Sequence, residues 1–174
     1  MEVDFETIVD AIISCLRGNI IKIPYFEYIG AFQSRDSVPK SRKGIYIFTA
    51  YEEISLSRKK IQQYNEAKNW NGTYVGAGFN YPFPDTIHVG DVYYLGKVTG
   101  KHNSIYQRLK IHFGDRTDCA TNGIKMKMTA RNFVDRKLIV HVFLFEKGND
   151  NYYIVNETEK RLHQKLRPLT GGSQ

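Results

Sequence analysis

The run Leu-Ile-Val-His-Val-Phe-Leu-Phe spans Leu138 to Phe145 and indicates the fold class. Its nearly continuous apolarity is typical of a central β-strand that is buried on both faces. We interpret His141 within it as a satisfied core histidine rather than as a ligand. Such a strand needs partners, and two shorter runs, Gly44 to Phe48 and Tyr93 to Val98, fit strands of the same sheet.

Helical patterns lie on either side of these strands. Between Phe5 and Leu16 apolar residues recur at helical spacing behind Asp4, a suitable N-cap. We interpret this helix as a packing arm, with a dimerisation element as the alternative. Further helices are expected over residues 52–68, 104–113 and 157–166, and Tyr152 to Val155 is expected to extend the sheet.

These elements predict an α+β fold: a small central antiparallel sheet of about three strands, flanked by helices. At 174 residues the chain fits one main domain. We expect residues 1–39 to form an N-terminal helical extension and linker, and residues 40–174 to form the functional domain. An insertion at about 51–90 separates the first two strands, and loops of that length are usually functional or disordered.

The chain is moderately basic, with 25 Lys and Arg against 18 Asp and Glu, for a net charge of +7. A basic excess favours a polyanionic partner, because cations on phosphates release counterions. A merely soluble basic surface is the plainer interpretation. The basic residues near the two shorter strands favour nucleic acid: Lys40, Arg42, Lys43, Lys97, Lys101, Arg108 and Lys110.

Cysteine content and the N-terminus indicate the compartment. Only Cys15 and Cys119 are present, which gives neither a disulfide framework nor zinc-ligand spacing. The first residues lack the basic start and apolar block of a signal peptide, and no apolar run approaches membrane-spanning length. We therefore expect a cytoplasmic protein with no membrane partner.

Side chains suited to phosphodiester cleavage follow one another along the chain. Gly44-Ile45-Tyr46 and Tyr94-Leu95-Gly96-Lys97 precede a predicted helix that carries Arg108 and His112, and Glu159 follows near the C-terminus. Two phenols, a lysine, an arginine, a histidine and a carboxylate offer a proton acceptor, charge neutralisation and a metal ligand. Since Arg108 and His112 are four residues apart, a helix places them on one face.

The choice of Tyr94 needs an argument, because the chain contains three Tyr-x-Gly strings. The string Tyr28-Ile29-Gly30 precedes Gly44 and so lies in the wrong order. Tyr74-Val75-Gly76 is a genuine rival, but no basic helix follows it for about thirty positions. Lys97 directly follows the string at Tyr94, which we prefer for that reason.

This order of motifs resembles the GIY-YIG nuclease superfamily over about residues 42–170. The family pattern places a leucine three residues and a proline nine residues after its metal-binding glutamate, so Leu162 and Pro168 select Glu159 over Glu157. Many members also carry an asparagine shortly after that proline. Here Leu169 to Gln174 follows instead, so the supporting hydrogen bond is either absent or supplied by Thr170 or Ser173.

The resemblance implies a role for each residue of the site. Tyr46 lies near the attacking water as proton acceptor, with help from His112, while Tyr94 and Lys97 orient the water and the phosphate. Arg108 contacts the scissile phosphate, and Glu159 holds Mg²⁺, with Mn²⁺ as the alternative ion. An ordinary tyrosine pKa is about 10, so a Tyr46 phenolate at neutral pH needs neighbouring cations that lower the pKa.

The function that follows is a metal-dependent DNA endonuclease, of the type II restriction kind, that leaves 5′-phosphate ends. Its partner would be double-stranded DNA, and two strand cuts on a symmetric site suggest a homodimer. The alternatives are a GIY-YIG nuclease of another role, such as phage defence, mobile-element processing or RNA cleavage, and a binding module without turnover. Predicted nucleic-acid contacts are Lys43, Lys101, Lys110, Lys125, Lys127 and Arg131.

Overall fold

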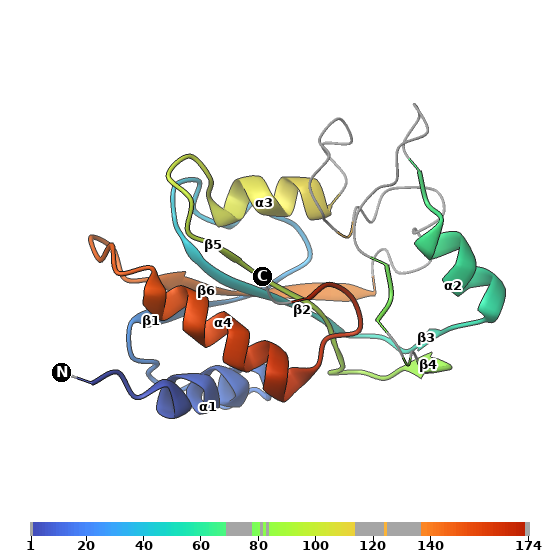
Figure 1. The fold of residues 1–174 in the computed structure, drawn as a ribbon, viewed down its shortest axis with the longest axis horizontal. Coiled ribbons are helices and arrows are strands. Elements are labelled where there is room, and N and C mark those ends of the chain that lie inside the picture. The colour runs from blue at the N-terminus through green and yellow to red at the C-terminus, as the bar shows by residue number, and fades with distance from the viewer. Residues whose placement is uncertain are drawn as a thin grey trace.

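A four-stranded antiparallel sheet lies at the centre of the molecule (Figure 1). The computed structural model describes residues 2–68, 78–80, 82, 84–113, 124 and 137–172. In spatial order the strands are β1 (Phe26–Phe32), β6 (Leu138–Phe145), β2 (Gly44–Ala50) and β5 (Val92–Val98). The apolar run from Leu138 to Phe145 forms β6, which pairs with β1 and β2. The predicted α+β class is therefore confirmed.

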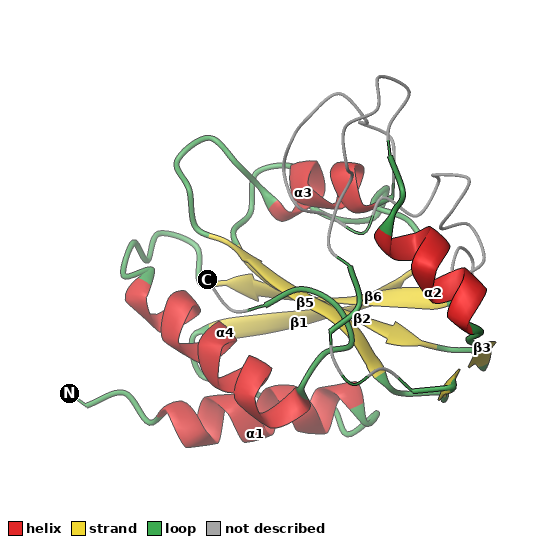
Figure 2. Cartoon of the chain, turned by 45° about the vertical axis from the view of Figure 1, so that its right-hand side comes forward, coloured by secondary structure: helices red, strands yellow, loops and turns green. Residues whose placement is uncertain are grey.

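Helices cover both faces of this sheet (Figures 1 and 2). On one face lie α2 (Arg58–Asn65) and α3 (Ile105–His112), and on the other lie α1 (Phe5–Leu16) and α4 (Tyr153–Leu166). Because successive strand residues point to opposite faces, Tyr46 and Phe48 join the core under α3, whereas Ile45 and Ile47 join the core under α1 and α4.

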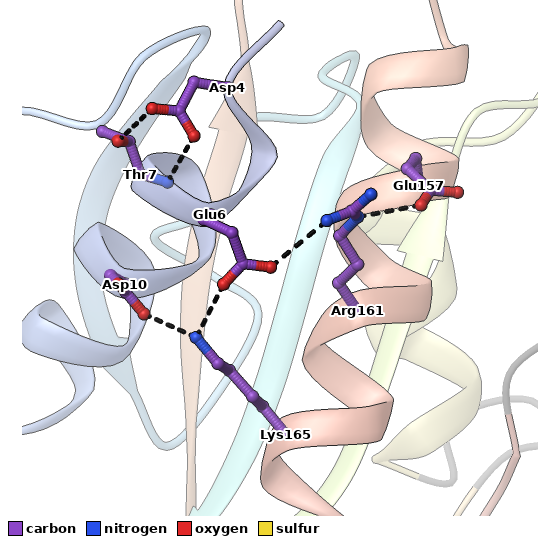
Figure 3. Close-up of polar contacts among 7 residues, drawn as sticks. All are labelled: Asp4, Glu6, Thr7, Asp10, Glu157, Arg161 and Lys165. Carbon is purple, nitrogen blue, oxygen red and sulfur yellow. Dashed lines mark hydrogen bonds and ion pairs between the residues drawn. The ribbon is translucent and has the colours of Figure 1, made fainter.

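Helix α1 is docked on α4 within the chain, as the packing-arm interpretation predicts. Asp4 caps it, since its Oδ1 accepts the Thr7 N–H at 3.1 Å. The side chains that it buries include Ile8, Val9 and Ile12. At the rim of the contact, Lys165 pairs with Glu6 at 3.0 Å and with Asp10 at 2.8 Å, and Arg161 reaches Glu6 at 3.2 Å (Figure 3).

Three secondary-structure predictions differ from the structure. The sheet has four strands rather than about three, because Phe26–Phe32, which we assigned to the N-terminal extension and linker, pairs with β6. The helix expected over 52–68 is instead a short strand, β3 (Ile54–Ser55), followed by α2. Ser57 starts α2 by accepting the Lys60 N–H, and β3 pairs with β4 (Thr86–Ile87).

The third difference concerns Tyr152 to Val155, which does not extend the sheet. Helix α4 starts at Tyr153, and Ile154, Val155 and Leu162 are buried at helical spacing in the core that α1 shares. Aromatic and β-branched residues favour strands in isolation, but burial on a helix face outweighs that preference here. Among the described residues no helix has the length and apolarity needed to cross a membrane. Cys15 is a buried free thiol, and Cys119 lies outside the described part of the chain.

Candidate active site

The phenol of Tyr46 is the centre of a buried polar cluster under α3. Tyr46 is 1% exposed, and its register partner on β5 is Gly96. A Cβ on Gly96 would lie 2.6 Å from Cζ of Tyr46, so only glycine leaves room for the ring. The Tyr46 hydroxyl contacts His112 Nε2 at 2.9 Å and accepts the Arg108 Nε–H at 3.3 Å. The predicted helical pair thus meets the first predicted tyrosine.

Tyr94 joins the same cluster from β5. Its ring centroid lies 4.7 Å from that of His112 and 6.3 Å from that of Tyr46, with which it is stacked. Tyr94 is 7% exposed. The Arg108 guanidinium hydrogen-bonds the Tyr94 phenol and opposes the rise in its pKa that burial causes, as it does for Tyr46. Both predicted tyrosines therefore share one guanidinium. The rival Tyr74 lies outside the described residues.

A second cluster lies on the opposite face, where α4 packs on β5. Lys97 Nζ is 2.9 Å from Glu159 Oε2, and His163 Nε2 is 3.3 Å from Glu159 Oε1. Glu159 is 3% exposed and His163 is 9% exposed. The His163 contact is within ion-pair distance but lacks hydrogen-bond geometry, so we take Lys97 as the principal partner of the carboxylate.

Strand β5 connects the two clusters, because it supplies both Tyr94 and Lys97. Burial raises the pKa of the Tyr94 phenol, and the negative charge of the nearby Glu159 carboxylate adds a smaller rise. All six residues that the sequence singled out for chemistry thus lie around β5, from positions 46 to 159 of the chain. Arg108 belongs to α3 and Glu159 to α4, and these two helices lie on opposite faces of the sheet (Figure 1).

Burial controls the protonation of the Tyr46 cluster. It raises the pKa of the Tyr46 phenol well above its ordinary value, the Tyr94 phenol adds to this, and Arg108 opposes it. Burial, helped by Arg108, also lowers the pKa of His112 well below its ordinary value. The side-chain cations alone therefore do not bring the pKa of Tyr46 down, because desolvation outweighs Arg108 and Lys97 faces Glu159 instead. The expected help of a metal-bound water network stays a prediction.

The C-terminal segment packs against β5 beside Tyr94. Thr170 N–H donates to the Tyr93 carbonyl at 3.0 Å, and a Cβ on Gly171 would lie 2.8 Å from the Tyr94 ring. Asn80 Nδ2 donates to the Pro168 carbonyl at 3.0 Å and to the Gly171 carbonyl at 2.6 Å. An asparagine thus supports the turn after the proline, but it comes from the insertion. Among the described residues the Thr170 Oγ1 has no hydrogen-bond partner, so Thr170 does not supply the expected side-chain hydrogen bond. Ser173 lies outside the described residues, and its role stays a prediction.

The predicted nucleic-acid contacts fall into three groups. The Lys43 ammonium is held by the backbone carbonyls of Gly100, Lys101 and Asn103, which ties down the loop before α3. Lys101 is exposed and Lys110 is half-buried on α3. Lys125, Lys127 and Arg131 lie outside the described residues. Sequence reasoning missed Arg35, which stacks with Lys40 on the Tyr106 ring at 5.0 Å and 5.9 Å, respectively.

Glu159, the carboxylate for which the resemblance implies a metal ion, is 3% exposed and paired with Lys97. Within the described ranges no three His, Cys, Asp or Glu side chains form a metal-binding group. A carboxylate oxygen suits Mg²⁺ or Mn²⁺, and Mg²⁺ keeps most of its waters, so a single protein carboxylate fits it. Lys97 shows that the site compensates the charge of Glu159 with a cation. The neighbouring His163 imidazole suits Mn²⁺ better than Mg²⁺.

No family model, no curated protein and no solved structure matches this chain.

Proposed function

We propose that the chain is a metal-dependent endonuclease that hydrolyses phosphodiester bonds in DNA, in keeping with its resemblance to the GIY-YIG superfamily. The observation that carries the proposal is the shared cluster of Tyr46, Arg108 and His112, which β2 and α3 bring together from sequence motifs 66 residues apart. A buried tyrosine and a buried histidine in contact with a half-buried arginine are more than packing requires, since each polar group costs desolvation.

Each side chain has a chemical task in this proposal. Arg108 neutralises the scissile phosphate, because a guanidinium matches the geometry of phosphate oxygens. Tyr46 and Tyr94 orient the attacking water. Added positive charge near the buried phenol favours the Tyr46 phenolate, which forms by release of the hydroxyl proton to solvent, and the phenolate then accepts the proton of the water. Glu159, with His163 beside it, would hold Mg²⁺ or Mn²⁺. When bound, that ion supplies Lewis-acid stabilisation of the phosphate and the added positive charge.

The partner in this proposal is double-stranded DNA. Lys101, Lys110 and the Arg35–Tyr106–Lys40 stack lie on or beside α3, the helix that carries Arg108. Arginine and lysine contact phosphates, and the presence of these cations on the α3 side of the sheet, where Arg108 also lies, supports a DNA backbone on that side. We favour a cytoplasmic, homodimeric, type II restriction-type enzyme that leaves 5′-phosphate ends. A nuclease of another role, RNA cleavage and a binding module without turnover are the alternatives.

Plasmid cleavage tests the proposal. With Mg²⁺ the protein should cut supercoiled plasmid, chelation should stop it, and sequenced ends should carry 5′-phosphates. Arg108→Ala and Glu159→Gln should each lower the cleavage rate by roughly 10²-fold or more at unchanged folding. Glu157→Gln is the matched control, since Glu157 lies on the same helix but pairs with Arg161 at 2.8 Å.

Three results would separate the alternatives. Cleavage of RNA but not of plasmid would show that the substrate is RNA. Heterogeneous ends would contradict the restriction role. Plasmid binding that Arg108→Ala weakens, with no cutting under any metal, would favour the binding module. Cutting that ignores both chelation and Glu159→Gln would overturn the site.

A further inference from the structure

The backbone N–H of Ile124 donates to Nδ1 of His112 at 3.0 Å. Ile124 is fully buried in the same core as Tyr46, and His112 has no exposed surface. Sequence reasoning gave Ile124 no role. The contact is informative because a backbone N–H only donates, so the Nδ1 that receives it must carry a lone pair.

This fixes which nitrogen of His112 carries the proton. A neutral imidazole has one N–H and one lone pair, and the lone pair is at Nδ1, so the proton is at Nε2. Nε2 lies 2.9 Å from the Tyr46 hydroxyl. His112 therefore donates to Tyr46 and has no lone pair left there to take a proton from it.

The tautomer has a consequence for Tyr46. Its oxygen accepts two hydrogen bonds, from His112 Nε2–H and from Arg108 Nε–H. A phenol oxygen has two lone pairs, so both are in use and the hydroxyl proton must point away from α3. The same two donors would stabilise the phenolate that forms when the Tyr46 phenol loses its proton.

We propose that the Ile124 amide is a positioning group that locks His112 in the Nε2–H tautomer, making His112 a hydrogen-bond donor to Tyr46 and not a proton acceptor. The inference deepens the proposed function and rests on it for its effect on cleavage. Its structural part, the tautomer, is independent of turnover. It replaces the earlier expectation that His112 helps to remove the proton.

Nitrogen NMR of ¹⁵N-histidine-labelled protein measures the tautomer directly. The chain has five histidines, and His112→Gln identifies the His112 signals by their loss. Long-range ¹H–¹⁵N correlations at neutral pH should show a protonated Nε2 and an unprotonated Nδ1. A protonated Nδ1, or a mixture of tautomers, in the wild-type protein would overturn the proposal without any variant.

Removing the amide gives the second test. Ile124→Pro deletes the N–H, and Ile124→Val keeps it with a similar side chain. In folded Ile124→Pro the His112 signals should shift toward a mixture of tautomers, and cleavage should fall about tenfold, as expected for one lost hydrogen bond at a reacting group. Ile124→Val should match the wild type in both.

The outcomes keep this inference apart from the proposed function. An Nε2–H tautomer in a protein that cleaves no nucleic acid would support the positioning role of the Ile124 amide and contradict the proposed nuclease function. A nuclease whose His112 carries its proton on Nδ1 would do the reverse. Unchanged tautomer and unchanged cleavage in folded Ile124→Pro would also overturn the role of the amide.

Discussion

At the scale of single residues, the site depends on the absence of a side chain at Gly96. The ring of Tyr46 occupies the space where a Cβ would stand, at 2.6 Å from Cζ. Gly96→Ala must therefore push the phenol away from Arg108 and His112. We expect a loss of about 1–3 kcal/mol in the free energy of unfolding, and a large loss of cleavage. Urea denaturation and the plasmid assay measure the two effects.

Gly100→Ala is the control for that substitution. Among the described residues a Cβ there would meet only Asn103 Nδ2, at an ordinary 3.6 Å. Stability and cleavage should both remain close to wild type. If Gly96→Ala were as stable and active as Gly100→Ala, the Tyr46 ring could not lie where the structure places it.

Residue motifs predicted one part of this site and missed another. Tyr46, Arg108 and His112 stand in short strings whose order along the chain carries information. Ile124 acts through its backbone N–H, which any residue but proline supplies, so its type gives no signal. Asn80 acts on backbone carbonyls of the C-terminal segment, a contact that exists only after folding.

At the scale of elements, periodic segments were predicted well and irregular ones were not. The α1 and β6 predictions match the structure because an apolar stripe and a continuous apolar run specify them. Strand β1 was missed because the register shift between Tyr28 and Gly30 interrupts its alternation, and Glu27 is exposed. The insertion was misread because Ser57, a helix cap, lies inside the expected helix.

His141 connects three strands of this sheet and predicts a dependence of stability on pH. Its Nδ1 contacts the Tyr28 hydroxyl of β1 at 2.8 Å, and its Nε2 contacts Thr49 Oγ1 of β2 at 3.0 Å. Burial lowers the pKa of His141 to about 4. An unfolded histidine, with a pKa of about 6.5, binds protons first as the pH falls. Stability should be complete above pH 6.5 and decline toward pH 4.

The expected contribution of His141 is about 3 kcal/mol across that interval. His112, whose pKa is also lowered, adds in the same direction. Urea denaturation at pH 7 and pH 4.5 should show this loss, and His141→Gln should flatten it. His88→Gln is the control, because the His88 side chain is 70% exposed. An equal pH dependence in wild type and His141→Gln would show that the folded sheet accommodates a protonated His141, and it would contradict this prediction.

At the scale of the whole molecule, a net charge of +7 predicts a salt-dependent affinity for nucleic acid, but not where the nucleic acid binds. In the proposed function the nucleic acid binds on the side of α3, which carries Arg108, and α3 and α4 lie on opposite faces of the sheet (Figure 1). Lys101 and Lys110 belong to the α3 side with Arg108, whereas Lys165 pairs with Glu6 and Asp10 on the α4 side (Figure 3).

A comparison of lysines on the two faces tests this assignment. For a duplex without a recognition site, log K should fall linearly with log salt concentration, and each lost phosphate contact should reduce the slope by about 0.9. Lys101→Ala and Lys110→Ala should each weaken binding and flatten the slope, and the double variant should do so by about twice as much. Lys165→Ala removes the same charge from the α4 side and should change neither. Equal effects of all three substitutions would mean that only net charge attracts the duplex. They would contradict the prediction that the duplex binds on the side of the Arg108 cluster.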